Sequence, residues 1–211
     1  MSVVSFATKA VERVAISFPF LTKILRMNYK KVVENEISLG QISCNDKVLC
    51  IGGGPLPYTA LEIADRTGAK VEIVDNDIGA VKAAGSLIEK LNMSNRVSVA
   101  YGDGQEVDTS EFSVVHVAMQ AEPHDKILEN IWQKSKTGTR ILLRRPNDKL
   151  ELLYSNLPEG CHYPTCNLAG QSSCTIKETL LFTKGSGRGV NEETDPRHGR
   201  VATGSCPFLG S

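Results

Sequence analysis

The sequence predicts an α/β fold, with a mostly parallel sheet covered by helices and an antiparallel hairpin at its end. The main observation is that short hydrophobic runs alternate with helix-like segments between about residues 47 and 145. This alternation is typical of β–α–β units, in which parallel strands are buried on both faces. Two further strand-like runs after Arg145 are joined by turn-rich chain without a helix, and they predict the hairpin.

The first 40 residues are predicted to form helices ahead of the sheet. Apolar residues recur every three or four positions between residues 4 and 15, which indicates one stripe of an amphipathic helix. Pro19 interrupts this pattern. A second helical segment is expected over about residues 21–39, and Gly40 is a suitable residue to end it.

The elements of the predicted sheet follow in order along the chain. Strands are expected at KVLCIGG, KVEIVD, RVSVAYGD, FSVVHVAM and RILLRR, and helices at YTALEIADRTG, IGAVKAAGSLIEKLN and HDKILENIWQKS. The final run, which contains Ile176, Thr179 and Leu181, fits a strand of the closing hairpin. Six glycines then occur in the last 27 residues without periodicity, so a flexible tail is predicted.

Composition and charge exclude several classes of protein. Lys plus Arg and Asp plus Glu both number 24, so no global field favours nucleic acid or anionic lipid. Lys9, Glu12 and Arg13 interrupt the apolar amino-terminal stretch, which therefore lacks the roughly 18 uncharged residues of a membrane span. It also lacks the features of a signal peptide. We expect a cytoplasmic protein without nucleic-acid or membrane partners, and the oligomeric state is open.

The six cysteines are expected to be free thiols of a protein in a reducing compartment. Cys161, Cys166 and Cys174 cluster near His162, but no CxxC pair occurs. No metal site is therefore predicted, and a metal site or redox pair in this cluster is the alternative.

The turn over residues 52–54, after the first strand, is the candidate ligand site. In open parallel sheets, ligands bind beyond the carboxyl ends of the strands, and glycine lets the backbone approach them closely. The helix that follows offers unpaired N–H groups and a positive dipole end to a carboxylate or phosphate. Asp75 ends the second strand about 20 residues later, where a carboxylate can accept hydrogen bonds from ribose hydroxyls.

The spacing of the glycines favours S-adenosylmethionine over a dinucleotide. The dinucleotide fingerprint G-x-G-x-x-G requires a third glycine, but the pattern here is Gly52-x-Gly54-x-x-Pro57. Methyltransferase-type domains lack that requirement and commonly carry an acidic residue after the third strand, where Asp103 lies. NAD or FAD, or a glycine turn without a cofactor, are the alternatives.

At IGGGPLPYT the sequence resembles the nicotianamine synthase family, a branch of the class I methyltransferase superfamily with a Rossmann-like fold. The resemblance covers about residues 28–145. Upstream, Asn28, Tyr29 and Glu36 are similar to an N-Y-x6-E element. Downstream, VDNDIGA and ILLRR are similar to the family's D-x-D segment and fifth strand, with Arg144 as the arginine.

The resemblance implies specific roles for residues of this chain. Tyr29 would approach the cofactor from a helical lid and is the candidate catalytic residue. The implied cofactor-binding residues are Gly52, Gly53, Gly54, Pro55, Leu56, Asp75, Asn76, Asp103, Gly104, Ala118, Met119 and Gln120. Residues 1–40 would form the helical arm or lid, 41–184 the S-adenosylmethionine-binding domain and 185–211 the tail.

The predicted function is S-adenosylmethionine-dependent transfer to a small-molecule acceptor. Members of the resembling family carry a helical domain ahead of the cofactor domain, whereas 28 residues precede Tyr29 here. Methyl transfer is therefore favoured over aminocarboxypropyl transfer. A non-catalytic S-adenosylmethionine-binding subunit and an NAD-dependent reductase are further alternatives.

Two histidines are candidate general bases near the fourth strand. His116 is expected to be a core residue of that strand, and His124 is expected at the surface. Glu36 is expected on a solvated helix face.

Overall fold

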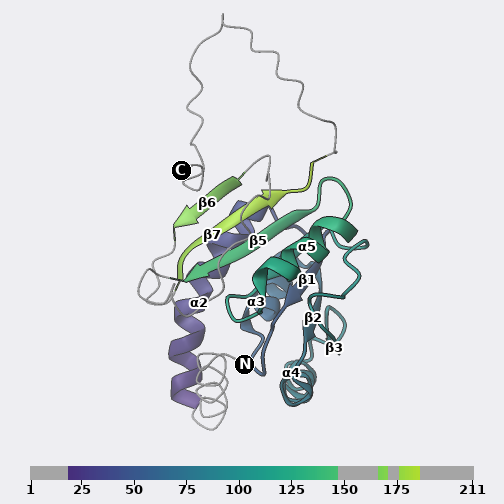
Figure 1. Cartoon of the computed structure of the whole chain (residues 1–211). Coiled ribbons are helices and arrows are strands. Elements are labelled where there is room, and N and C mark those ends of the chain that lie inside the picture. Colours follow the sequence, from purple (N-terminus) through teal and green to yellow (C-terminus); the bar gives the residue numbers. More distant parts are fainter. Residues whose placement is uncertain (1–18, 147–165, 171–175, 186–211) are drawn as a thin grey trace, which may run out of the picture.

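A computed structural model describes residues 19–146, 166–170 and 176–185, and they form a seven-stranded sheet with helices on both faces (Figure 1). The strand order is β3-β2-β1-β4-β5-β7-β6. The strands are β1 (Lys47–Ile51), β2 (Lys70–Asp75), β3 (Val97–Tyr101), β4 (Val114–Val117), β5 (Arg140–Pro146), β6 (Cys166–Gly170) and β7 (Ile176–Thr183).

The sheet has the mixed character that the sequence predicts. Strands β3, β2, β1, β4 and β5 are parallel, and β7 pairs antiparallel with both β5 and β6. The predicted Rossmann-like α/β fold and its terminal hairpin are therefore confirmed. The carboxyl ends of β1, β2 and β4 lie at one edge, and the chain crosses to the other half of the sheet between β3 and β4.

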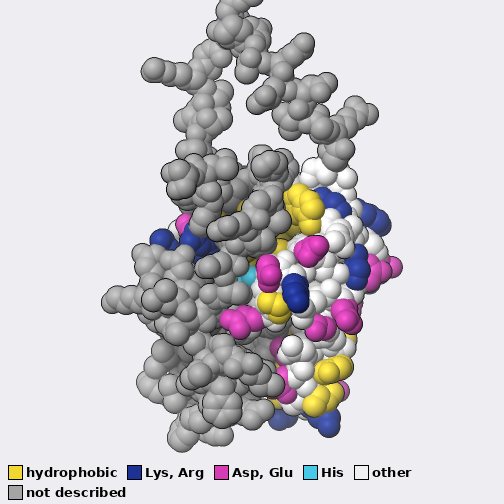
Figure 2. Space-filling view, viewed as in Figure 1, with side chains coloured by type: hydrophobic (Ala, Val, Ile, Leu, Met, Phe, Trp, Pro, Cys, Tyr) yellow, Lys and Arg dark blue, Asp and Glu magenta, His cyan; other side chains and the backbone are white. Residues whose placement is uncertain are grey.

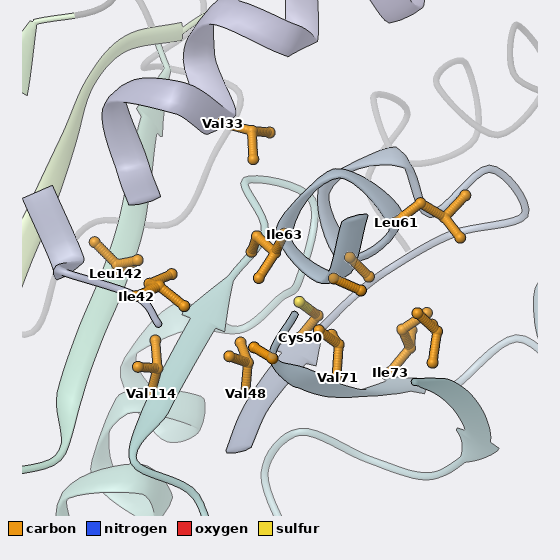
Figure 3. Packing of buried hydrophobic residues seen from close by; sticks show 14 of the residues in the cluster. Val33, Ile42, Val48, Cys50, Leu61, Ile63, Val71, Ile73, Val114 and Leu142 are labelled. Carbon is orange, nitrogen blue, oxygen red and sulfur yellow. The ribbon is translucent and has the colours of Figure 1, made fainter. Parts of the chain in front are cut away.

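Four helices cover the sheet among the described residues: α2 (Pro19–Gly40), α3 (Tyr58–Thr67), α4 (Ile78–Lys90) and α5 (His124–Lys134). Alternate residues of each strand face opposite layers. Val48 and Cys50 of β1 pack with α2, α3 and α4, whereas Leu49 and Ile51 pack with α5. Figure 3 shows the first layer, with Val33 of α2 and Ile63 of α3 above the strands.

The helix boundaries have local causes. Pro19 begins α2 because the first turn of a helix tolerates a missing N–H. Gly68 ends α3 in the left-handed conformation, with a φ of 76°. Asp77 caps α4 by accepting hydrogen bonds from the N–H groups of Gly79 and Ala80.

Several predictions fall outside the described residues. They concern the first predicted helix, the chain between β5 and β6, Cys161 and Cys174, and the tail apart from its first residue. None of the helices in the described ranges has the length and apolarity that crossing a membrane requires. Figure 2 shows acidic and basic side chains interspersed over the described part of the visible face, in keeping with a formal net charge of zero.

Candidate functional site

The candidate site lies at the carboxyl edge of β1, β2 and β4, where backbone and side-chain hydrogen bonds join three loops. The N–H of Gly52 donates to the carbonyl of Val74 at 2.9 Å. The N–H of Gly54 donates to Oδ2 of Asp75 at 2.8 Å. Nε2 of Gln120 donates to the carbonyl of Gly52 at 3.1 Å. The structure therefore brings together the glycine turn, Asp75 and the loop after β4.

The three positions of the turn favour glycine for different structural reasons. Gly52 and Gly54 adopt φ values of 81° and 65°, which side chains disfavour. A Cβ on Gly52 would also lie 2.9 Å from Cβ of Ala121. On Gly53 it would lie 2.3 Å from Cγ2 of Ile73. Close packing against Ala121 and Ile73 therefore explains why Gly52 and Gly53 carry no side chain, even without a ligand.

Asp75 is buried, with 8% of its surface exposed, and it organises the turns on both sides of it. Its Oδ2 accepts from Gly54, and its Oδ1 accepts from the N–H of Asp77 at 2.9 Å. An ionised carboxylate has about four lone-pair positions, so two acceptor positions remain. The next residue, Asn76, is exposed at the end of β2.

The loop after β3 holds Asp103 and Gly104 in place through its own contacts. Oδ1 of Asp103 accepts from the N–H of Gln105 at 2.9 Å, and both carboxylate oxygens accept from the Gln105 amide. A Cβ on Gly104 would lie 2.5 Å from Cγ2 of Ile51, so this loop is packed against the end of β1. The buried Asn130 of α5 donates to the carbonyl of Gly104, a contact that sequence reasoning missed.

The loop after β4 carries Ala118, Met119 and Gln120. The N–H of Ala118 donates to the carbonyl of Ile51 at 3.0 Å, which extends the β1–β4 pairing beyond the strands. Nε2 of His124 lies 3.4 Å from the carbonyl of Ala118. His124 is only 3% exposed, so the predicted surface position is wrong. The loop returns over the end of the sheet and buries the first residue of α5.

The amino end of α3 lacks a side-chain cap. Its N-cap residue, Pro57, makes no side-chain hydrogen bond to the helix, and the first turn contains no acidic residue. Pro55 is buried and Leu56 is half-buried between this end and the glycine turn. The first-turn N–H groups and the helix dipole can therefore stabilise a carboxylate.

A buried polar cluster connects α2 with β4, β5 and β7. Glu36 is fully buried, so the prediction of a solvated face is wrong. Its carboxylate accepts two hydrogen bonds from Arg144, both at 2.7 Å, and one from Oγ1 of Thr179 at 2.9 Å. Nε2 of His116 lies 3.4 Å from Oε2 of Glu36. His116 is 1% exposed, as predicted for a core residue.

The electrostatics of this cluster follow from burial and pairing. Burial raises the pKa of Glu36, but Arg144 and His116 together outweigh it and hold that pKa well below its usual range. Burial is the main reason that the pKa of His116 is lowered. The cluster therefore favours the ionised form of the Glu36 carboxyl beside the Arg144 guanidinium. Among described buried side-chain nitrogens and oxygens, Nε2 of His116 alone has no hydrogen-bond partner.

Two predicted features remain without a side-chain description. The backbone of Tyr29 lies in α2, and its side chain is outside the described part of the structure. Cys166 lies on β6.

Of the cysteines whose side chains are described, Cys44 is exposed, Cys50 is buried, and both are free. The described residues contain no cluster of three or more His, Cys, Asp or Glu side chains suited to a metal ion.

Comparisons with known proteins identify a family and several similar chains. A family profile described as nicotianamine synthase protein matches residues 7–163. The L-histidine 2-aminobutanoyltransferase of Yersinia pestis is 33% identical over 70 residues, which are 33% of this chain and 26% of that protein. The chain therefore spans about a quarter of this curated relative.

Solved structures show the same relationship. MtNAS in complex with MTA and tNA is 29% identical with a TM-score of 0.64, covering 82% of this chain and 64% of that one. A variant of MtNAS in complex with S-adenosylmethionine is 28% identical with a TM-score of 0.65, covering 84% and 71%. An RNA methyltransferase from Salinibacter ruber, 18% identical with a TM-score of 0.60, shares the fold and covers 78% and 96%.

Proposed function

The chain belongs to the nicotianamine synthase family, and on that premise we propose that it is an S-adenosylmethionine-dependent transferase with a small-molecule acceptor. The observation that carries the proposal is the junction of the glycine turn, Asp75 and Gln120 at the carboxyl edge of the sheet. A similar chain, a variant of MtNAS, has been solved with S-adenosylmethionine.

The residues present fit this cofactor. The uncapped amino end of α3 offers N–H groups to the methionine carboxylate, next to the backbone of residues 52–56. Asp75 is already held by two backbone N–H groups and has acceptor positions left for the ribose hydroxyls. We assign Asn76, Asp103 and Gly104 to the adenine side.

Ala118, Met119 and Gln120 would line the place of transfer, opposite the glycine turn. The sulfonium group of the bound cofactor supplies an activated leaving group, so the protein's task is to hold an acceptor in line with it. Gln120 is tied to the carbonyl of Gly52, which keeps the loop after β4 against the cofactor turn. Tyr29, on α2, is the proposed contact from the acceptor side.

We propose transfer of an aminocarboxypropyl group rather than the methyl transfer that the sequence alone favoured. Two findings support this choice: the family membership, and the relative from Yersinia pestis, whose name describes transfer of a 2-aminobutanoyl group. A cytoplasmic location and the absence of a nucleic-acid partner stay predictions from the sequence.

Product analysis tests the type of transfer. The full chain is incubated with S-adenosylmethionine and a panel of amino acids and amines, and the nucleoside product is identified by mass spectrometry. Methylthioadenosine is the expected product. S-adenosylhomocysteine would instead establish methyl transfer. Cofactor binding without either product would favour a non-catalytic subunit.

The assignment of Asp75 is tested by Asp75→Asn, which keeps the shape of the side chain but removes its charge. We expect S-adenosylhomocysteine to bind at least tenfold more weakly by calorimetry, since hydrogen bonds to a charged group contribute about 1.5–3 kcal/mol. Asp108→Asn is the matched control, because Asp108 is exposed and accepts from the N–H of Ser110 in a similar turn. Equal binding by both variants would remove Asp75 from the cofactor site.

A further inference from the structure

We propose that Glu36 and Arg144 are positioning residues: their buried ion pair fixes helix α2 over the acceptor side of the transfer site. The inference rests on the proposed function. Neither residue belongs to the proposed cofactor site, which uses the ends of β1, β2 and β3 and the loop after β4. Arg144 lies on β5, on the opposite side of β4 from β1.

Strand β5 holds α2 at two points. Nη1 of Arg140 donates to the carbonyls of Gly40 and Gln41 at 2.6 and 2.9 Å, at the carboxyl end of the helix. Arg144 binds Glu36 one helical turn earlier. Leu142 lies between these two arginines on β5. A Cβ on Gly40 would lie 3.1 Å from its Cδ1, so the helix and the strand approach each other closely. The helix is therefore attached to one face of β5 along that strand.

The order of these contacts defines the direction of the helix. Gly40 meets the beginning of β5, and Glu36 meets a residue near its end, so the earlier residues of α2 extend past the carboxyl edge of β5. Figure 1 shows α2 passing behind β5 and continuing beyond the tip of that strand. Residue 29 precedes Glu36 by seven positions, which is about 10 Å along a helix. The ion pair thus sets where this part of α2 lies relative to the carboxyl edge.

The pair also lies beside the strand that leads into the transfer loop. His116 of β4 lies 3.4 Å from Glu36 and two residues before Ala118. Thr179 of β7 donates to the same carboxylate. Four elements therefore meet at Glu36, and the two-pronged contact with Arg144 restricts both the direction and the distance of the helix.

A positional role explains the chemistry of the cluster better than stability does. Burying two charges costs desolvation, and apolar residues of similar volume often stabilise a protein equally well or better. Apolar contacts of α2, such as those of Val33, already attach the helix to the core. A directional, fully satisfied ion pair adds a defined geometry to that attachment.

The test separates position from stability by comparing single and double variants of the full chain. Glu36→Gln leaves Arg144 buried without its counter-charge, so both stability and turnover should fall. Glu36→Leu with Arg144→Met removes both charges, and stability should return to near that of the wild type. We expect turnover in this double variant to stay roughly 10- to 100-fold below wild type, because small misplacements slow positioned reactions. S-adenosylhomocysteine affinity should be unchanged.

Glu178→Gln is the matched control. Glu178 of β7 pairs at 2.8 Å with Arg145, the residue that follows Arg144 on β5. This control should keep its turnover. Hydrogen exchange provides a readout that does not need activity: the α2 amides of residues 30–36 should lose protection in Glu36→Gln and keep it in Glu178→Gln.

Four results would overturn the inference: recovery of turnover together with stability in the double variant, full turnover in Glu36→Gln, loss of cofactor affinity in parallel with turnover, or unchanged protection of α2. Failure of the proposed function gives a different pattern, because the wild type would then yield neither nucleoside product. In that case hydrogen exchange still decides whether the pair fixes α2.

Discussion

Gly53 and Gly104 were predicted to contact a cofactor, and each also fills a position where the fold leaves no space for a side chain. A Cβ at these positions would lie 2.3 Å from Ile73 and 2.5 Å from Ile51. Both isoleucines lie on strands that end at the candidate site. The same glycines therefore bring the turn and the loop close to the sheet edge, whatever they contact beyond it.

We predict that Gly53→Ala and Gly104→Ala each lower the free energy of unfolding by about 1–3 kcal/mol, the usual cost of overpacking a core. Urea denaturation measures the change. Gly85→Ala is the control. Gly85 lies in α4, and a Cβ there would lie 3.6 Å from Cγ1 of Val99, which is an ordinary van der Waals distance. That variant should gain about 0.5–1 kcal/mol from higher helix propensity. A loss in Gly85→Ala equal to the others would contradict the packing argument.

The two described thiols should differ in reactivity. Burial raises the pKa of Cys50 to about 12, while Cys44 is exposed. Because the thiolate is the reactive form, iodoacetamide at neutral pH should label Cys44 in the native protein and spare Cys50. Peptide mass spectrometry distinguishes them, and denaturation should make Cys50 reactive. Rapid native labelling of Cys50 would show that β1 opens readily.

At the scale of elements, α2 is attached to the sheet by polar side chains as well as by apolar packing. Its carboxyl end is held by Arg140 and its middle by Arg144, both from β5. On its other side, Glu34 pairs with Arg66 of α3 at 2.8 Å, but this pair is largely exposed and contributes little. The contacts with β5 therefore add directional polar attachments to the apolar packing of α2, in which Val33 lies in one cluster with residues of α3.

The cluster beneath α2 predicts a pH dependence of stability. The pKa of His116 is lowered in the folded protein, so below about 6.5 the unfolded chain binds more protons than the folded one. The free energy of unfolding should therefore decrease as pH falls through 6.5. Glu36, whose folded pKa is also lowered, adds a loss of the same sign only below its ordinary value of 4.5.

The measurement is denaturant unfolding at several pH values between about 7.5 and 5.5, above the range in which carboxylates titrate. His116→Asn should show a smaller decrease than the wild type over this range, because the buried imidazole is gone. Parallel curves for the two proteins would mean that His116 takes up its proton equally in both states.

For the whole molecule, the strand order determines where a ligand can bind. The chain crosses from β3 to β4 next to β1, so the loops after β1 and β4 separate at the carboxyl edge. The residues predicted from the sequence for cofactor binding lie at this edge, in its loops or, for Asp75, as the last residue of β2. The opposite edge carries ion pairs, such as Lys47 with Glu111 and Arg140 with Asp46.

We predict that S-adenosylhomocysteine raises the melting temperature of the chain and that NAD does not. A ligand present at 100 times its dissociation constant adds about 2.7 kcal/mol to the stability of the state that binds it. Differential scanning fluorimetry at equal ligand concentrations measures both. A shift with NAD alone would support the reductase alternative.

Local sequence was sufficient to predict the order and type of the elements between residues 41 and 146 and the hairpin after them. Short buried runs, glycine turns and helix ends are local patterns, and each determines its own element. Local sequence also predicted the turn at 52–54 and Asp75 as parts of one site, because a β–α–β unit places them at one edge regardless of the rest of the chain.

Only the tertiary structure decided the partners of Glu36, Arg144 and His124. Glu36 and Arg144 are 108 residues apart, and no periodicity shows that a charged helix residue is neutralised by a distant strand. His124 likewise depends on a loop that folds back over the sheet. Side-chain pairing across elements is set by how the layers pack, whereas the pattern within each element is set by its neighbours along the chain.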